Sequence, residues 1–374
     1  MTLSQERRAT GRDPVGRRLR VPPVPVAVGP GERASVTVVV PCFNYGRYLV
    51  ESVSSVLEQP GVDVDVVVVD DLSTDDSAAV ADTLAAADDR VRVVRMPENR
   101  GPVAAFNAGL EHVTGEFLVR LDADDLLTPG SLARAVALVR AHPSVGLVYG
   151  HPSHFVEGGP RRPARTTASA WTIWPGHQWV QDRCADGYNV ITSAEVVMRS
   201  DLVARVGGQL PLAHTHDMEM WLRLAAFGDV GYVHGADQAW HRDHDLSLSA
   251  REVDVVVDLA ERRLAFHALF DGAAGGLGWA AAARRTADAA LDRQVLDTMT
   301  HELDVHGAVT ETYLRLDGMA IAPTSANLRR KRAIARRAAR GRRPVDVLAG
   351  TARRARDRVR RAWTERSWHR NGVY

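Results

Sequence analysis

From Val36 onward, short runs of consecutive apolar residues alternate with longer segments in which apolar residues recur every three or four positions. The runs are rich in valine and predict strands at residues 36–41, 64–70, 91–96, 116–121 and 145–149. The segments between them predict helices at residues 47–59, 73–87, 101–113 and 129–142. Strands that are apolar throughout are typical of a parallel sheet buried on both faces. The sequence therefore predicts a doubly wound, mostly parallel α/β sheet, which binds its ligands beyond the carboxyl ends of the strands.

The pattern changes along the chain and divides it into five parts. Residues 1–34 mix Arg, Pro and Gly without periodicity, so we expect a disordered basic and Pro-rich segment. Residues 35–150 hold the first half of the sheet, and residues 151–250 hold a second half that starts irregularly. Residues 251–324 predict a helical extension, and residues 325–374 predict an Arg-rich amphipathic tail.

The net charge of +1 conceals an uneven distribution of charged residues. Residues 1–34 carry 7 basic and 3 acidic side chains, and residues 325–374 carry 17 and 3. The rest of the chain therefore has 23 basic and 40 acidic side chains, a net charge of −17. Because nucleic-acid phosphates are bound by basic surfaces, this acidic core argues against nucleic acid as a partner.

The basic tail permits two interpretations. Apolar residues recur at helical spacing among its arginines, namely Val345, Leu348, Ala352, Ala355, Val359 and Trp363. Such a helix can lie on an anionic membrane surface. It can equally pack on the acidic core or remain solvated.

Two features bear on location. No apolar stretch approaches the ~20 residues that span a bilayer, and the first residues lack the apolar centre of a secretory signal. Cys42 and Cys184 are the only cysteines, so the sequence suggests no disulfide framework and fits a reducing compartment. We expect a cytoplasmic protein, with peripheral contact at the inner face of the plasma membrane if the tail binds lipid.

Polar clusters follow three of the predicted strands. PCFNYG, DDLSTD and DADD each come directly after an apolar run. Because the carboxyl ends of parallel strands meet at one edge of a sheet, we expect these clusters to lie on one rim. The rim is the predicted binding site.

The cluster DADD places Asp122, Asp124 and Asp125 within four residues. Carboxylates this close repel one another unless positive charge lies between them. Mg²⁺ and Mn²⁺ are held by one or two carboxylates together with phosphates and water, so the cluster indicates a metal–diphosphate site. The alternative is a solvated acidic turn.

Two further strand ends carry candidate ligands. Asp75 is the better cap for the helix after DDLSTD, which leaves Asp70 and Asp71 for a pyrimidine base or a ribose. In NRGPVAAFNAG, Gly101 permits close backbone approach, and the N-terminus of the following helix favours phosphate. Asn107 lies in the second turn of that helix, where a plain surface position is the alternative.

Five segments occur in the order found in family 2 glycosyltransferases, which are inverting, nucleotide-sugar-dependent enzymes of the GT-A fold. The segments are VVVPCFNYGRYLVESVSSVLEQ, VDDLSTD, NRGPVAAFNAG, LDADDLLTPGSL and HDMEMWLRLA, and the resemblance covers roughly residues 35–250. It implies that residues 35–150 bind the nucleotide-sugar and residues 151–250 bind the acceptor.

The resemblance also implies roles for the donor-binding residues. Pro41 and Phe43 border the nucleotide base, and Asp71 binds it. The remaining expected donor contacts are Asn99, Arg100, Gly101, Asn107 and Asp122. Phe106 stands where the family often has Arg or Lys, so Arg100 is the expected substitute for that phosphate contact.

Metal and catalytic residues follow from the same resemblance. Asp122 and Asp124 match the Asp-x-Asp motif, with Asp124 as the direct ligand of Mg²⁺ or Mn²⁺, and His244 completes the metal shell or touches the diphosphate. Asp217 matches the catalytic base, although His216 replaces the usual Glu before it. Glu219 is the alternative base.

These roles define a single displacement, in which the acceptor oxygen loses its proton to Asp217 and attacks the anomeric carbon. The expected donor is a UDP-sugar, with dTDP- and GDP-sugars as alternatives. The expected acceptor is a saccharide, a lipid-linked molecule or a small molecule in bacterial polysaccharide, glycolipid or secondary-metabolite synthesis. The alternative functions are an inactive nucleotide-sugar-binding protein and a nucleotidyltransferase, although PCFNYGRY lacks the Gly-rich basic loop of the latter.

Overall fold

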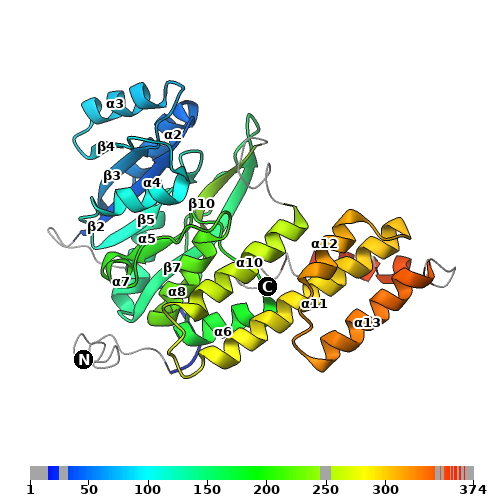
Figure 1. Ribbon diagram of the computed structural model, residues 1–374. Helices are drawn as coiled ribbons and strands as arrows, with labels where there is room; N and C mark the ends of the chain where they lie inside the picture. The colour runs from blue at the N-terminus through cyan, green and yellow to red at the C-terminus, as the bar shows by residue number, and fades with distance from the viewer. Residues whose placement is uncertain are drawn as a thin grey trace. The chain divides into compact units, whose positions relative to one another are not determined.

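The computed structural model describes residues 16–24, 33–244 and 254–341, together with part of the segment 346–366 (Figure 1). The chain divides into two compact units. The first unit comprises Met1–Trp179, Ile191–Pro211 and His216–Ser247. The second comprises Val180–Val190, Leu212–Thr215 and Leu248–Tyr374.

A mixed sheet forms the centre of the first unit. Its strands are β1 (Leu19–Val21), β2 (Ala34–Cys42), β3 (Val62–Asp70), β4 (Val91–Arg95), β5 (Phe117–Arg120), β6 (Leu126–Leu127), β7 (Val145–Val156), β8 (Ala170–Trp174), β9 (Val197–Arg199) and β10 (Asp229–Asp243). They follow the order β1-β8-β10-β7-β9-β5-β2-β3-β4, and β6 pairs with β10. The pairs β5–β2, β2–β3, β3–β4 and β7–β10 are parallel. The predicted mostly parallel α/β class is therefore confirmed.

Four helices match those that the sequence predicts for residues 35–150, namely α2 (Gly46–Leu57), α3 (Ser77–Ala87), α4 (Gly101–Leu110) and α5 (Ser131–Ala141). The first unit also contains α7 (Ser200–Val206) and α8 (His216–Phe227), while α6 (Gly176–Asp186) continues into the second unit. Val38 on β2 packs in one core with Leu49 and Val53 of α2. Val39 points to the opposite face, where Gly109 of α4 lies so close that an added Cβ would be 2.4 Å from Val39 Cγ1. Burial on both faces explains why the valine run is uninterrupted.

The second half of the sheet is more regular than the sequence predicts. Strand β7 continues to Val156, well past the expected end at residue 149, and β10 extends from Asp229 to Asp243. Strands β8 and β9 are antiparallel to their neighbours. Polar residues occupy the later positions of β10, and His234, Asp237 and Gln238 are buried there. The apolar pattern therefore stops before the strand does.

Part of the N-terminal segment belongs to the sheet, which corrects the expectation that residues 1–34 are disordered. Strand β1 pairs antiparallel with β8, and the Arg18 guanidinium lies 4.3 Å from the centre of the Trp174 ring. This pairing joins residues about 150 positions apart in the sequence, so local composition does not indicate it.

The second unit is helical, as predicted for residues 251–324. It contains α10 (Val255–Asp271), α11 (Ala280–His306), α12 (Glu311–Met319) and α13 (Ser325–Arg340). Asp254, Thr310 and Thr324 cap three of these helices through side-chain oxygens that accept backbone N–H groups. Across the described part of the chain, none of the helices combines the length and apolar character that a bilayer crossing requires.

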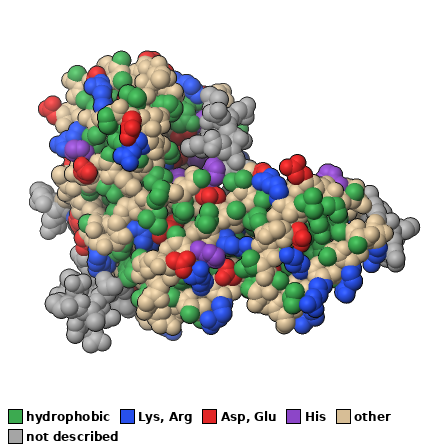
Figure 2. All heavy atoms as spheres, viewed as in Figure 1, with side chains coloured by type: hydrophobic (Ala, Val, Ile, Leu, Met, Phe, Trp, Pro, Cys, Tyr) green, Lys and Arg blue, Asp and Glu red, His purple; other side chains and the backbone are tan. Residues whose placement is uncertain are grey.

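The Arg-rich tail is partly engaged within this unit. Basic side chains gather over α13 (Figure 2), and Arg337 and Arg353 each approach the buried Asp304 of α11 at 2.6 Å. Val359 and Trp363 are exposed, whereas Val345 and Leu348 of the predicted apolar stripe lie outside the described residues. Packing on α11 therefore accounts for Arg337 and Arg353 of the tail.

Candidate functional site

The three polar clusters meet at one edge of the sheet, as parallel pairing requires. Cys42 at the end of β2 lies opposite Asp70 at the end of β3, and Val39 lies opposite Arg120 at the end of β5. The loops that follow these strands therefore begin side by side. This edge lies wholly within the first unit.

The loop after β2 is tied to the loop after β3 by Asn44. Its side-chain oxygen accepts hydrogen bonds from the backbone N–H groups of Thr74, at 2.8 Å, and Asp75, at 3.3 Å. Asn44 adopts a positive φ of 59°, which Asn tolerates better than most residues. Pro41 is buried at the strand end, while Phe43 is 43% exposed and offers an open aromatic surface at the rim.

Asp71 is buried and holds the next loop. Its two carboxylate oxygens accept hydrogen bonds from the backbone N–H groups of Arg100, at 2.9 Å, and Gly101, at 2.7 Å. Asp75 accepts the Ser77 N–H at 2.9 Å at the start of α3, although Asp76 occupies the N-cap position. Asp70 is not left free, because it accepts the Ser73 N–H at 3.2 Å. The expectation that the cap leaves Asp70 and Asp71 without partners is therefore wrong.

Three of the predicted donor residues, Asn99, Arg100 and Gly101, lie at the start of α4. Gly101 begins the helix with a φ of +83°, a conformation that glycine adopts without strain. Arg100 is exposed, follows Asn99 in the same exposed turn, and lies 3.6 Å from Glu98.

Asn107 points elsewhere. Its amide nitrogen donates to the Gln209 carbonyl at 2.8 Å, and its amide oxygen accepts the Gln209 N–H at 2.8 Å. This pairing fixes α4 to the loop after α7.

Each carboxylate of DADD faces a different basic group. Asp122 Oδ1 lies 2.7 Å from Arg120 Nη2. Asp124 Oδ2 lies 2.8 Å from His244 Nε2. Asp125 Oδ2 lies 2.9 Å from His241 Nδ1, and its other oxygen accepts the backbone N–H of Arg242. Three separate partners thus relieve the repulsion among the aspartates, and two of them come from the end of β10.

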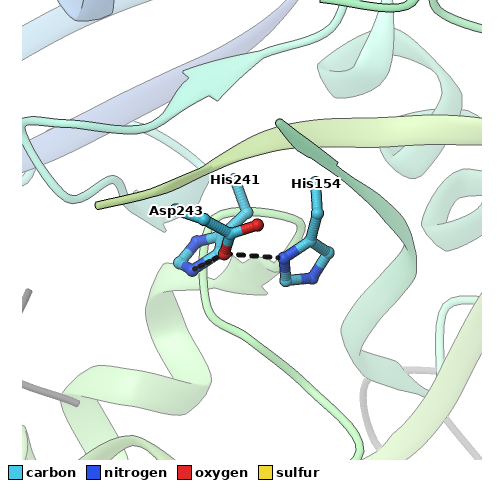
Figure 3. Close-up of side chains that lie close together, drawn as sticks. All are labelled: His154, His241 and Asp243. Atoms are coloured by element: carbon cyan, nitrogen blue, oxygen red, sulfur yellow. Dashed lines mark hydrogen bonds and ion pairs between the residues drawn. The ribbon is translucent and has the colours of Figure 1, made fainter. Parts of the chain in front are cut away.

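The predicted metal ligands offer a partial shell. Asp122 is about one-third exposed and Asp124 lies beside it, so both present the hard oxygen atoms that Mg²⁺ and Mn²⁺ prefer. The ligand atoms of Asp122, Asp124 and His244 do not all lie within 4.8 Å of one another. Among the described residues, that spacing is met by His154, His241 and Asp243 (Figure 3).

Asp217 lies in the first turn of α8 and is half-buried. Its carboxylate accepts hydrogen bonds from the Met218 N–H at 2.6 Å and the Ser193 hydroxyl at 3.2 Å. Burial raises the pKa of Asp217 to about 6, although the Met218 N–H and the positive charge of Arg120 oppose this rise. A carboxylate with such a pKa is suited to accept a proton near neutral pH.

Glu219, the alternative base, has a structural role. Its side chain is fully buried, and its carboxylate lies 2.9 Å from Arg223 Nη2. Arg223 also donates to the carbonyl groups of Val206, Gly207 and Gly208. Glu219 is therefore enclosed by protein and paired with Arg223.

Arg120 is the residue of this site that the sequence did not single out. It is buried, contacts Asp122, influences Asp217 electrostatically, and lies 6.0 Å from the centre of the Phe106 ring. It thereby places a positive charge beside the position where the family often has Arg or Lys. An arginine inside the apolar run EFLVRL, directly before DADD, was the available signal.

Comparisons with known proteins agree with this geometry. Residues 37–201 match the family model described as Glycosyl transferase family 2. The Bacillus subtilis protein named "Putative glycosyltransferase EpsE" is 30% identical over 201 residues, which cover 53% of this chain and 69% of EpsE. The succinoglycan biosynthesis protein ExoO of Rhizobium meliloti is 42% identical over 101 residues, covering 27% of this chain and 28% of ExoO. The chain spans about a third of the length of the first curated relatives that it matches.

A solved structure extends the comparison to the fold. The crystal structure of S. aureus TarS 1–349 in complex with UDP-GlcNAc has a TM-score of 0.54 at 17% identity, over 77% of this chain and 81% of that one. At this identity the likeness shows the fold, and it confirms the predicted GT-A-type sheet. The strand-end motifs, this fold and the extended match to EpsE lead to one assignment. The chain belongs to glycosyl transferase family 2.

Proposed function

We propose that this chain transfers a sugar from a nucleotide-diphosphate sugar to an acceptor hydroxyl, with inversion at the anomeric carbon. One observation carries the proposal: Arg120 contacts Asp122 of DADD and also acts on the charge of Asp217. A diphosphate-binding motif and a carboxylate of raised pKa therefore belong to a single charged centre. The complex of TarS with UDP-GlcNAc supports a UDP-sugar as the donor, with dTDP- and GDP-sugars as alternatives.

The donor end of the site is formed by the loops after β2 and β3. Phe43 offers its exposed ring to the nucleotide base beside Pro41. Asp71 acts through the backbone, because it holds the Arg100 and Gly101 N–H groups and so fixes the loop that the base and ribose approach. The N-terminus of α4 adds its positive dipole end beside the phosphates, although Asp71 already accepts the Arg100 and Gly101 N–H groups there.

Asp122 and Asp124 fit a divalent ion, Mg²⁺ or Mn²⁺, that is completed by phosphate oxygens of the donor. Such an ion, when bound, neutralises charge that develops on the diphosphate leaving group. His244 Nε2 lies 2.8 Å from Asp124 Oδ2 and orients this carboxylate. Tyr45 and Tyr48 hold the imidazole in place, with ring centres 5.7 and 5.6 Å from it.

At the acceptor end, Asp217 accepts the proton of the attacking hydroxyl. The Ser193 hydroxyl and the Met218 N–H orient the carboxylate, and burial keeps its proton affinity high. Attack from the face opposite the diphosphate needs no protein nucleophile, and a single displacement inverts the anomeric centre. The name of ExoO, a succinoglycan biosynthesis protein, supports a saccharide or lipid-linked saccharide as the acceptor.

The exposed end of the tail supports contact with the membrane where lipid-linked acceptors are found. Val359 and Trp363 are 71% and 69% exposed, and arginines surround them in the sequence. Arginine with exposed apolar side chains is the composition of helices that lie on anionic bilayers. This contact would place the chain at the inner face of the plasma membrane.

Turnover of a defined donor tests the proposal. Purified protein with UDP-GlcNAc and Mn²⁺ is expected to release UDP, and proton NMR is expected to show the sugar first in the β-configuration. Asp217→Asn should bind the donor in calorimetry as the wild type does and lose at least a hundredfold in UDP release. Asp89→Asn, which removes an exposed carboxylate, is the matched control. Binding of none of the UDP-, dTDP- and GDP-sugars would contradict the proposal.

A further inference from the structure

We propose that His154, His241 and Asp243 form a binding site for one Zn²⁺-class ion, separate from DADD. Figure 3 shows the two imidazole rings on either side of the Asp243 carboxylate. His154 Nδ1 lies 3.1 Å from Asp243 Oδ1, and His241 Nε2 lies 4.0 Å from the same oxygen. One ligand atom from each residue lies within 4.8 Å of the other two.

The sheet itself assembles these three side chains. His241 on β10 lies directly opposite His154 on β7 in parallel register. Asp243 follows His241 by two residues, and side chains two apart on a strand point to the same face. Their backbone positions are therefore set by strand pairing, and only rotation of the side chains is needed to close around an ion.

The distances suit a small tetrahedral ion. With Zn–N and Zn–O bonds of about 2.0–2.1 Å, two ligand atoms of such an ion lie about 3.4 Å apart. The His154–Asp243 pair is already near this spacing. The His241–Asp243 pair must close by a few tenths of an ångström, and the Asp243 side chain is 49% exposed and free to turn.

The surroundings of His241 supply the second observation. Its other ring nitrogen, Nδ1, faces Asp125, which is buried and fixed by the Arg242 N–H. A histidine that binds a metal commonly donates its second ring N–H to a carboxylate, which fixes the tautomer. In the zinc-bound form His241 keeps its Nδ1–H on Asp125, and Zn²⁺ takes the place of the Nε2 proton beside the Asp243 carboxylate.

The ligand types select the ion. Two imidazoles and one carboxylate favour Zn²⁺ and its borderline neighbours, whereas Mg²⁺ and Mn²⁺ prefer all-oxygen sites such as DADD. His154 and Asp243 are exposed, so an ion reaches the site from solvent, and the fourth position is open to water. The alternative is that a protonated His241 alone pairs with Asp125 and Asp243. In that case the three side chains would bind no zinc.

Zinc titration of the full-length chain, without an affinity tag, tests the site. Calorimetry with Zn²⁺ alone is expected to show one ion per chain. His154→Ala and Asp243→Asn should each weaken binding at least tenfold, while His177→Ala, which removes an exposed imidazole on α6, should leave it unchanged. His154 is exposed, so its substitution preserves the fold, which an unchanged Tm without zinc verifies.

Two further measurements separate this site from DADD. Asp124→Asn should keep the zinc affinity of the wild type, and Co²⁺ should give visible d–d absorption that His154→Ala alters. Equal zinc affinity in His154→Ala and wild type would overturn the proposal. Loss of zinc binding in Asp124→Asn, with retention in His154→Ala, would place the ion at DADD and overturn it equally.

Discussion

Arg120 Nη2 lies 2.7 Å from Asp122 Oδ1, and this buried guanidinium is the point where the DADD loop and the first turn of α8 meet electrostatically. The Arg120 side chain is buried, whereas the Asp122 side chain is about one-third exposed. Asp122 is therefore the solvent-facing member of the pair.

Replacing Arg120 by Leu is expected to lower activity at least tenfold and to shift the acidic limb of the pH–rate profile upward. The reason is that the positive charge of Arg120 lowers the pKa of Asp217, so its loss makes that carboxyl harder to ionise. The expected loss of stability is about 2 kcal/mol, less than for a fully buried pair because Asp122 is partly solvated. The profile of kcat/KM against pH checks this, and Arg120→Lys should restore most of the wild-type profile.

The pKa of Asp217, raised to about 6 by burial, predicts a pH dependence of activity and of stability. Activity should fall as pH drops below about 6, because the base becomes protonated. Between roughly pH 4 and 6 the folded state binds more protons at this site than the unfolded state, so its contribution to stability decreases as pH rises. Asp217→Asn should therefore increase the free energy of unfolding by about 1 kcal/mol at pH 7 while abolishing transfer. A lower Tm for this variant at pH 7 would count against the assignment.

Glu219→Gln should have the opposite effects to Asp217→Asn, because it should lower stability and leave activity nearly unchanged. Removing the carboxylate leaves Arg223 buried without its anionic partner, which costs about 3–5 kcal/mol of stability. Activity per folded molecule should stay within about threefold of the wild type, because Glu219 touches neither donor nor acceptor in the proposed mechanism. Denaturant unfolding together with initial rates at low temperature measures both quantities. A stable but inactive Glu219→Gln variant would make Glu219 the base.

Asp71→Ala is expected to reduce donor affinity and stability together. It removes the carboxylate that accepts two backbone N–H groups. Each hydrogen bond to a charged acceptor contributes about 1.5–3 kcal/mol to the free energy of unfolding. Loosening of the loop before α4 should raise KM for the nucleotide-sugar by more than it lowers kcat. Asp71→Asn retains one acceptor and should recover about half of the lost stability. Unchanged donor affinity in Asp71→Ala would show that this loop does not shape the donor site.

The sequence predicts the sheet edge and its motifs well because both depend on local pattern. Valine runs define the strands, and the polar residues after them must meet wherever the strands are parallel. What the sequence does not reveal depends on distant contacts. Asn107 is paired with Gln209, 102 positions away, and Glu219 is distinguished from Asp217 only by the burial that Arg223 and the loop after α7 provide.

The second half of the sheet also depends on distant contacts that the local sequence pattern does not show. His154 and His241 become neighbours through the register of β7 and β10, which hydrophobic pattern does not set because these residues lie beyond the core. Strand β1 joins β8 in a segment whose composition predicts disorder. In both places the pairing partner is determined by the assembled sheet, and a single sequence carries no local signal for it.

The one-to-one matching of the DADD carboxylates with Arg120, His244 and His241 has a consequence for the order of binding. The carboxylates of this cluster already have basic partners, so a free divalent ion gains little by entering it. A diphosphate adds negative charge beside the cluster and changes that balance. We therefore expect metal and nucleotide-sugar to bind with strong mutual cooperativity, with the affinity for Mn²⁺ alone far below the affinity in the presence of donor.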